Sequence, residues 1–249
     1  MKDFNNIKSN GKVFKLKVGE LVRFETDISH YYWLNERFIP GVSSILSEAS
    51  PTGYGLKLFW QNNTKEEADE IFNTAGEFGS LMHEAFEALL KGEELNLLRD
   101  YPREREKKTI LSFMDWFKEY EPKEFESEQS IASSRYSYAG TLDFVGIIKD
   151  ERWLIDFKTT SGIHYTHQLQ VLAYKQAYEE STGLKIDKVG IARFGTKHKA
   201  GYEFKEVTDY TIEDFMNLYR TYLSLNGGSI KEPKTIAIYP ETVKLLETL

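Results

Sequence analysis

Apolar residues along this chain recur with two different periods, and the way these periods follow one another predicts a mixed α/β protein. Apolar positions three or four residues apart indicate one face of a helix, whereas alternation at every second residue indicates a strand. Thr64 and Glu67 match a capping box, so a helix should begin there, and we expect it to bend near Gly76 and Gly79. The expected elements are short strands within 11–40, helical segments within 42–62 interrupted near 51–55, helices over 64–91, 109–120, 166–181 and 211–225, and strands over 126–135, 138–148, 152–158, 187–194 and 202–208.

The chain contains no linker rich in proline, glycine or serine, no internal repeat and no low-complexity segment. Its 249 residues are enough to bury a sizeable core. We therefore expect a single domain over 1–249, in which a β and helical elaboration at about 1–62 precedes a core at about 63–225.

Asp143 lies on one strand of an expected β-hairpin, and Asp156 and Lys158 lie on the other. The polar tetrad Lys149–Arg152 between these strands is the predicted turn. If the first and last residues of the tetrad pair, the antiparallel register sets Asp143 opposite Lys158, with Asp156 on the diagonal. All three charged side chains then point to one side of the sheet. A slip of one residue would move Asp143 to the other face, so the interpretation depends on the register.

Two carboxylates a few ångströms apart repel each other, and they stay ionised together only when a cation lies between them. Mg²⁺ or Mn²⁺ is the expected cation, because hard divalent ions prefer oxygen ligands. Lys158 would then hold a phosphate oxygen, or orient and activate the attacking water. This combination favours metal-assisted hydrolysis of a phosphodiester. The alternative is an ordinary surface salt bridge, since an Asp-x-Lys triplet also occurs by chance.

Gly76, Gly79 and His83 fall on one face of the helix expected at 64–91. Glycine inside a helix costs about 1 kcal/mol relative to alanine, so two glycines on one stripe indicate close approach by another backbone or by a ligand. A lone histidine in such a helix is most often a partly buried residue with satisfied hydrogen bonds. Beside a metal site with two carboxylates, however, the neutral imidazole of His83 becomes a candidate third ligand.

Four short motifs follow one another along the chain: Gly-x-x-x-His at 79–83, Gly-x-x-Asp at 140–143, Asp-x-Lys at 156–158 and Gln-x-x-x-Tyr at 170–174. In this order they resemble the motifs of the PD-(D/E)xK nucleases, and specifically of their RecB-like exonuclease branch. Phage exonucleases and the mitochondrial genome maintenance exonuclease belong to that branch. The segment Pro40–Leu46 is similar to the Pro-x-Val-Thr-x-Ile/Leu segment that precedes their histidine helix. The resemblance covers about residues 30–195.

This resemblance implies a restriction-endonuclease-like core, in which helices flank a central mixed β-sheet in the order α-β-β-β-α-β. It also implies a DNA exonuclease that hydrolyses phosphodiester bonds from DNA ends with one or two Mg²⁺ or Mn²⁺ ions. Two alternatives stay open: an endonuclease of the same fold that acts on particular structures or sites, and a nuclease-like nucleic-acid-binding module without turnover. Retention of both carboxylates, the lysine and the histidine speaks against the inactive module.

By the same resemblance, His83, Asp143 and Asp156 would hold the metal together with the main-chain carbonyl of Phe157. Lys158 would assist the attacking water, so Asp143, Asp156 and Lys158 are the expected catalytic residues.

The resemblance also implies roles for residues to which the pattern of the sequence assigns none. Gln170 and Tyr174 would position the DNA strand, and helix packing is the alternative for Tyr174. An additional acid upstream of the Gly-x-x-Asp strand often joins such sites, and of Glu126 and Glu128 we prefer Glu128. One departure is Phe78, which stands where phage members often carry a basic residue.

Composition and charge restrict these expectations. The chain has no cysteine, which excludes a disulfide and the four-cysteine iron–sulfur cluster that several RecB-like relatives carry. Its net charge of −7 does not exclude DNA as a partner, because a local positive groove and bound divalent cations act where the phosphate lies. Without metal, DNA binding should be weak and sensitive to salt. The residues that would line such a groove, or else lie on a solvated face, are Lys185, Lys188, Arg193, Lys197, Lys199 and Lys205.

Aromatic residues are concentrated in the first quarter of the chain, where Tyr54 and Trp60 would either stack on bases of a single strand or belong to the core. Whether the DNA is single-stranded or a duplex end stays open, as do polarity and oligomeric state. Apolar stretches are short and the first residues lack a hydrophobic signal core, so we expect a cytoplasmic protein, bacterial or phage-encoded, with no membrane partner. A recombination protein or a single-strand-binding protein is the candidate protein partner.

Overall fold

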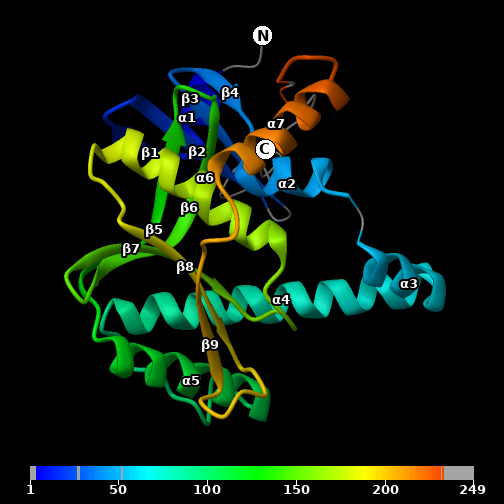
Figure 1. The fold of residues 1–249 in the computed structure, drawn as a ribbon, viewed down its shortest axis with the longest axis vertical. Helices are drawn as coiled ribbons and strands as arrows, with labels where there is room; N and C mark the ends of the chain where they lie inside the picture. The colour runs from blue at the N-terminus through cyan, green and yellow to red at the C-terminus, as the bar shows by residue number, and fades with distance from the viewer. Residues whose placement is uncertain (1–3, 27–28, 52, 231, 233–249) are drawn as a thin grey trace, which may run out of the picture.

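The structure is a computed structural model that describes residues 4–26, 29–51, 53–230 and 232. The elements are α1 (Phe4–Asn10), β1 (Lys12–Leu16), β2 (Gly19–Glu25), β3 (His30–Leu34), β4 (Arg37–Ile39), α2 (Val42–Ala49), α3 (Tyr54–Asn62), α4 (Lys65–Leu90), α5 (Glu104–Tyr120), β5 (Lys123–Ser133), β6 (Tyr138–Ile148), β7 (Glu151–Lys158), α6 (Tyr165–Thr182), β8 (Lys188–Phe194), β9 (Tyr202–Glu206) and α7 (Ile212–Leu225). Within the described residues the strands form a four-stranded sheet, in the order β1-β2-β3-β4, and a five-stranded sheet, in the order β5-β6-β7-β8-β9 (Figure 1).

The five-stranded sheet is mixed. β5, β6 and β7 pair antiparallel, β7 and β8 pair parallel, and β8 and β9 pair antiparallel. The parallel pair requires a crossover connection, which α6 supplies. Residues 189–192 of β8 are all buried, as is typical of a parallel strand covered on both faces. The order α5-β5-β6-β7-α6-β8 confirms the predicted α-β-β-β-α-β core of a restriction-endonuclease-like fold.

Helices cover both faces of this sheet, which is therefore the middle of three layers. On one face α4 and α5 meet it through aromatic residues, with the rings of Phe86 and Phe113 stacked 4.4 Å apart and both packed against Phe157. On the other face α2, α6 and α7 share a second core that includes Leu46 and Phe215. Figure 1 shows α4 and α5 running side by side beneath the strands.

The four-stranded sheet packs against the start of β6 and the end of β5. Leu21 and Tyr32 share a buried cluster with Ala132 and Ala139. The N–H of Ala139 also donates to the carbonyl of Pro40, at 3.0 Å. Strands within 11–40 were predicted from the sequence, but the helix α1 was not, because its seven residues bury a single side chain and leave almost no apolar period.

The turn between β6 and β7 differs from the prediction. Ile148 pairs with Glu151, so Lys149 and Asp150 alone form the loop, and both have left-handed backbone conformations, with φ of 51° and 64°. Such a two-residue loop is typical of a type I′ turn, whose twist matches that of the strands. The predicted pairing of Lys149 with Arg152 is therefore wrong by two residues. Because the shift is even, Asp143 keeps its face of the sheet.

Helix α4 runs without interruption from Lys65 to Leu90, beginning at the predicted capping box of Thr64 and Glu67. A Cβ added at Gly76 would meet no atom of the described residues within 4 Å, and one at Gly79 would meet only the hydroxyl of Thr159, at 3.8 Å. Of the two alternatives, approach by another backbone is thus wrong for both glycines within the described part of the chain, and approach by a ligand stays a prediction. No helix in that part is long and apolar enough to cross a membrane.

Candidate active site

Three neighbouring strands bring acidic residues into one row across the sheet. Ser127 pairs with Phe144 and Gln129 with Leu142, which leaves Glu128 of β5 across from Asp143 of β6. On the other side, Phe144 pairs with Ile155, so the same register continued by one residue sets Asp143 across from Asp156 of β7. The carboxylates therefore lie side by side because of strand pairing. The prediction had placed Lys158 opposite Asp143 and Asp156 on the diagonal.

His83 reaches this row from α4. Its Nδ1 lies 3.6 Å from Oδ1 of Asp143. Ligand atoms of His83, Glu128 and Asp143 all lie within 4.8 Å of one another, and each of these residues is partly buried. One imidazole nitrogen and two carboxylates at this spacing are a donor set that a divalent cation can join. Of the two candidate additional acids, Glu128 lies in this group and Glu126 does not.

Asp156 and Lys158 form a buried ion pair next to the row. Nζ of Lys158 lies 2.6 Å from Oδ2 of Asp156, whose side chain is 1% exposed. Burial raises the pKa of Asp156 to about 6, and the charge of Asp143 adds to the rise, while Lys158 and His83 oppose it. Burial acts to lower the pKa of Lys158, but the charges of Asp156 and Asp143 outweigh it and raise the pKa. The lysine is therefore held as an ammonium group.

Asp143 is also fixed by the main chain of the neighbouring strand. The N–H of Phe157 donates to Oδ2 of Asp143, at 2.6 Å, which leaves Oδ1 for His83 and for a ligand. The Phe157 ring is buried in the aromatic core between α4, α5 and the sheet. The main chain at Phe157 is thus anchored on one side and lies beside a carboxylate on the other. Its carbonyl as a metal ligand stays a prediction.

Gln170 and Tyr174 support the strand that carries Asp143. Nε2 of Gln170 donates to the hydroxyl of Tyr174, at 2.9 Å, and Tyr174 is 5% exposed. The Tyr174 ring lies directly over Gly140, where a Cβ would overlap ring atoms. Glycine is needed at this position because the ring occupies the space of a side chain. Packing is therefore an observed role of Tyr174, and positioning of DNA stays a prediction for both residues.

Comparison with known proteins gives the family of this chain. No curated protein sequence matches it significantly. A model described as the PD-(D/E)XK nuclease superfamily matches residues 52–242, which is more than half of the chain. The chain belongs to the PD-(D/E)XK nuclease superfamily. Family membership implies a nucleic-acid substrate and the use of divalent metal ions.

Solved structures similar to this nuclease include two bacterial proteins. A candidate exonuclease from Eubacterium rectale is 14% identical, with a TM-score of 0.47, and the match covers 82% of this chain and 91% of that one. An alkaline exonuclease from Laribacter hongkongensis is 12% identical, with a TM-score of 0.37, and the match covers 74% of this chain and 86% of that one.

The charges of the candidate site fit a divalent cation. Burial raises the pKa of Glu128 to about 7, with Asp143 and Glu87 adding to the rise and Arg23 and Lys91 opposing it. Oδ1 of Asp156 is buried and has no hydrogen-bond partner among the described residues. Glu128 also holds a left-handed backbone conformation, with φ of 52°, which costs an ordinary residue about 1–2 kcal/mol. A bound cation would offset the negative charge that crowds this position.

Arg23 is a site residue that the sequence analysis missed. It comes from β2 of the smaller sheet, and its Nη1 donates to Oγ1 of Thr141, at 2.9 Å, while the Tyr32 hydroxyl lies 3.2 Å from the same oxygen. Thr141 lies two residues before Asp143 and points to the same face of β6. The detectable signal is a charged residue inside the apolar run of β2, since charges are seldom buried without a partner.

The basic residues proposed for a DNA groove do not act as one surface. Lys188 pairs with Glu151 and Glu206, at 3.2 and 3.4 Å, and lies at the start of β8. Arg193 pairs with Glu203, at 2.6 Å. Lys205 pairs with Asp209, also at 2.6 Å. Acidic neighbours therefore neutralise half of the predicted set.

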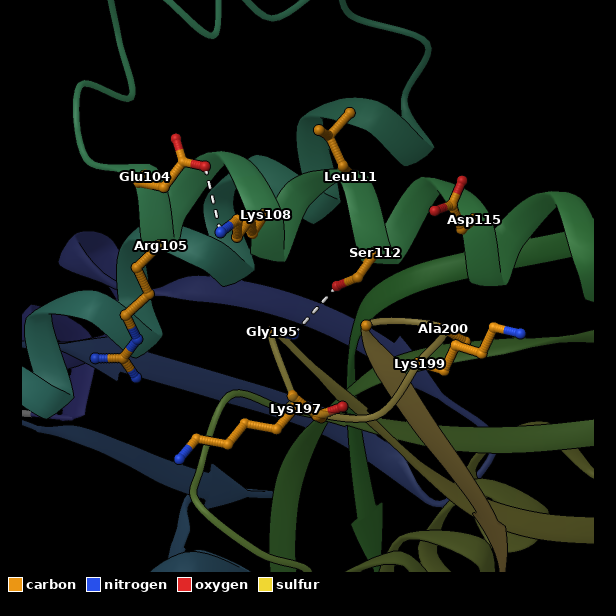
Figure 2. Close-up of a pocket in the computed structure, with 12 residues that line it drawn as sticks. Glu104, Arg105, Lys108, Leu111, Ser112, Asp115, Gly195, Lys197, Lys199 and Ala200 are labelled. Atoms are coloured by element: carbon orange, nitrogen blue, oxygen red, sulfur yellow. Dashed lines mark hydrogen bonds and ion pairs between the residues drawn. The ribbon is translucent and has the colours of Figure 1, made fainter.

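Lys197 and Lys199 belong to the loop between β8 and β9 and line a cavity of about 600 Å³ beside α5 (Figure 2). Figure 2 shows Lys197 and Lys199 pointing to opposite sides of this cavity, and Lys108 paired with Glu104. Nζ of Lys108 lies 3.4 Å from Oε1 of Glu104. Asp115 lines the same cavity, so its charges are mixed. This cavity is separate from the row of carboxylates, none of which lines it.

Proposed function

We propose that this protein is a Mg²⁺- or Mn²⁺-dependent deoxyribonuclease that acts as an exonuclease of the RecB-like branch on DNA ends. The observation that carries the proposal is the convergence of His83, Glu128 and Asp143 within 4.8 Å, beside the buried pair of Asp156 and Lys158. Family membership supports a nuclease, and the order of the four sequence motifs supports the branch.

The residues that would hold the cation are His83, Asp143 and Asp156, with the carbonyl of Phe157 and with Glu128 as the additional acid. The unpartnered Oδ1 of Asp156 and the raised pKa of Glu128 support this set, because a cation would give that oxygen a partner and would offset the burial and negative charge that raise the pKa of Glu128. The cation, when bound, would lower the pKa of a water molecule and offset charge on the phosphate.

The side chains of the protein have distinct tasks in this proposal. Lys158, kept charged by Asp156, orients the attacking water or holds a phosphate oxygen as water adds to phosphorus and the P–O bond to the leaving nucleotide breaks. Asp143 stays in place because the N–H of Phe157 binds one of its oxygens. Gln170 and Tyr174 keep the strand of Asp143 against α6 and position the DNA.

We also propose that the chain forms one nuclease domain, with residues 1–62 as an elaboration of the core at 63–225. What supports this is the hydrogen bond from Arg23 to Thr141, together with the bridge between Gly41 and Ala139. The first contact joins the smaller sheet, and the second joins the segment that follows β4, to the strand that carries Asp143. The elaboration thereby becomes a structural support of the site.

The proposal is tested by incubating the protein with end-labelled linear DNA and with covalently closed circular DNA, in Mg²⁺ and in EDTA. We expect linear DNA to be shortened from its ends in Mg²⁺, circular DNA to stay intact, and neither to change in EDTA. Cutting of the circles would instead select the endonuclease of the same fold. Binding without cleavage of either DNA would select the inactive module.

A further inference from the structure

A groove of about 920 Å³ lies between α2, α3, the first half of α4 and the start of α6. Its floor is mostly apolar, and among the described residues that line it there is no aspartate or glutamate, although the chain has 39 acidic residues. Ser43, Ser47 and Thr166 are among the polar residues that line it. A groove without carboxylates in an acidic protein is suited to an anionic ligand with apolar parts.

Aromatic rings gather at the outer end of this groove. Phe59 of α3 and Phe72 of α4 line it, with ring centroids 5.2 Å apart. Trp60 contacts both rings, at 5.9 and 5.4 Å. Trp60 and Phe72 are each 44% exposed, so the rest of the protein covers these side chains only in part. The side chain of Tyr54, the other predicted stacking residue, lies outside the described residues.

No residue of the row of carboxylates lines this groove, but its end at Gln170 lies next to the packing that supports the strand of Asp143. Gln170 lines the groove and donates to Tyr174, whose ring rests on Gly140 of the strand that carries Asp143. Helices α2 and α6 both begin here, and α2 has no side-chain cap at its N-terminus. Backbone N–H groups at helix N-termini favour anions such as phosphate. The starts of these two helices and Gln170 thus lie in one part of the groove lining, and the aromatic rings come from α3 and α4.

We propose that this groove binds the unpaired bases of a single-stranded DNA end, which stack on the cluster of Phe59, Trp60 and Phe72 while the backbone leads to the row of carboxylates. The inference rests on the proposed nuclease function and adds its substrate class. Unpaired bases expose the π-faces that exposed aromatic side chains bind, whereas the bases of a duplex are already stacked on one another. The closeness of Gln170 in its lining to the strand of the proposed phosphodiester-hydrolysing site favours this occupant over an apolar peptide.

Binding in EDTA tests the inference without requiring cleavage. Fluorescence anisotropy compares three labelled probes of equal length: an oligothymidylate, the same backbone with abasic sites, and a blunt duplex. We expect the oligothymidylate to bind at least about tenfold more tightly than the other two, because it alone offers free bases. Equal affinity for the oligothymidylate and the abasic probe would overturn the inference.

The variant Phe72→Ala tests whether the base-dependent binding takes place in the groove. We expect it to weaken oligothymidylate binding by about fivefold to 150-fold, the range for one stacked base, and to leave abasic binding unchanged. Leu184→Ala, which removes an apolar side chain 47% exposed on another surface, is the matched control and should change neither. Circular dichroism checks that both variants fold, and Phe72→Trp should retain base-dependent binding.

Two further outcomes separate this inference from the proposed function. If the protein shortens linear DNA in Mg²⁺ but Phe72→Ala binds the oligothymidylate as tightly as the wild type does, the nuclease function stands and the single-strand inference fails. If no DNA is cleaved, the nuclease function fails, and base-dependent binding lost in Phe72→Ala would still support the groove as a single-strand binding site.

Discussion

Gly140 and Gly76 differ in the space that their surroundings leave for a side chain. A side chain at Gly140 would overlap the Tyr174 ring, whereas one at Gly76 would meet open space. We expect Gly140→Ala to lower the free energy of unfolding by about 1–3 kcal/mol through overpacking. Gly76→Ala, the control inside an exposed helix, should raise it by about 0.5–1 kcal/mol. Denaturant titration of both variants measures this, and equal changes of the same sign would contradict the packing described.

His167 is a residue whose charge the fold suppresses. Its Nδ1 accepts the N–H of His164, at 3.2 Å, in the first turn of α6. Burial, together with the charges of Lys158 and His164, lowers the pKa of His167 to about 3. Below about pH 6.5, His167 binds a proton in the unfolded chain but not in the native state. The free energy of unfolding therefore falls as the pH falls towards about 3.

The matching variant is His167→Gln, because glutamine at this position also completes a capping box. We expect the wild type to lose stability relative to the variant between about pH 6.5 and about pH 4, by up to about 1 kcal/mol per pH unit. Asp156 and Glu128 act in the opposite direction, since burial raises their pKa values, but they are present in both proteins and cancel in the difference. Parallel stability curves for the two proteins would refute a suppressed charge at His167.

At the scale of elements, the sequence predicts best where the apolar period is long. Strand β6 has the predicted bounds, and α6 and α7 agree within one residue. Helix α5 begins at Glu104, five residues before the predicted start, because its first turn is charged and shows no apolar period. The hairpin register was wrong because Lys149 and Asp150 adopt left-handed conformations that are uncommon for residues with a side chain.

The same turn supplies a prediction at this scale. Replacing Lys149 and Asp150 with Asn and Gly matches the preference of a type I′ loop for those residues. We expect the double variant Lys149→Asn/Asp150→Gly to raise the free energy of unfolding by about 0.5–1 kcal/mol, since relief of left-handed strain exceeds the extra entropy of glycine. The urea midpoint should rise while its slope stays constant. A lower midpoint would mean that the loop is not of this type.

For the whole molecule, the sequence motifs found the residues that the structure brings together, but not the contacts between distant segments. His83 and Asp143 were predicted as neighbours from motif order, and Nδ1 of His83 lies 3.6 Å from Oδ1 of Asp143. Arg23 was missed because its partner Thr141 lies 118 positions away in the sequence. The spacing of apolar residues predicts helices and strands, but it does not predict a contact between such distant positions. The groove beside α3 was equally invisible, since it depends on how α3 and α4 stand against α2 and α6.

The central claim is that Asp143 and its neighbours form a divalent-metal centre that cleaves DNA. Its most direct test is the rate of nucleotide release from linear DNA as a function of Mg²⁺ concentration, for the wild type and for Asp143→Asn, which can still accept the N–H of Phe157. Asp150→Asn, in the exposed turn of the same hairpin, is the control. The account predicts saturable, Mg²⁺-dependent release in the wild type and the control, and a loss of several orders of magnitude in Asp143→Asn. Release that needs no Mg²⁺, or that survives in Asp143→Asn, would contradict it.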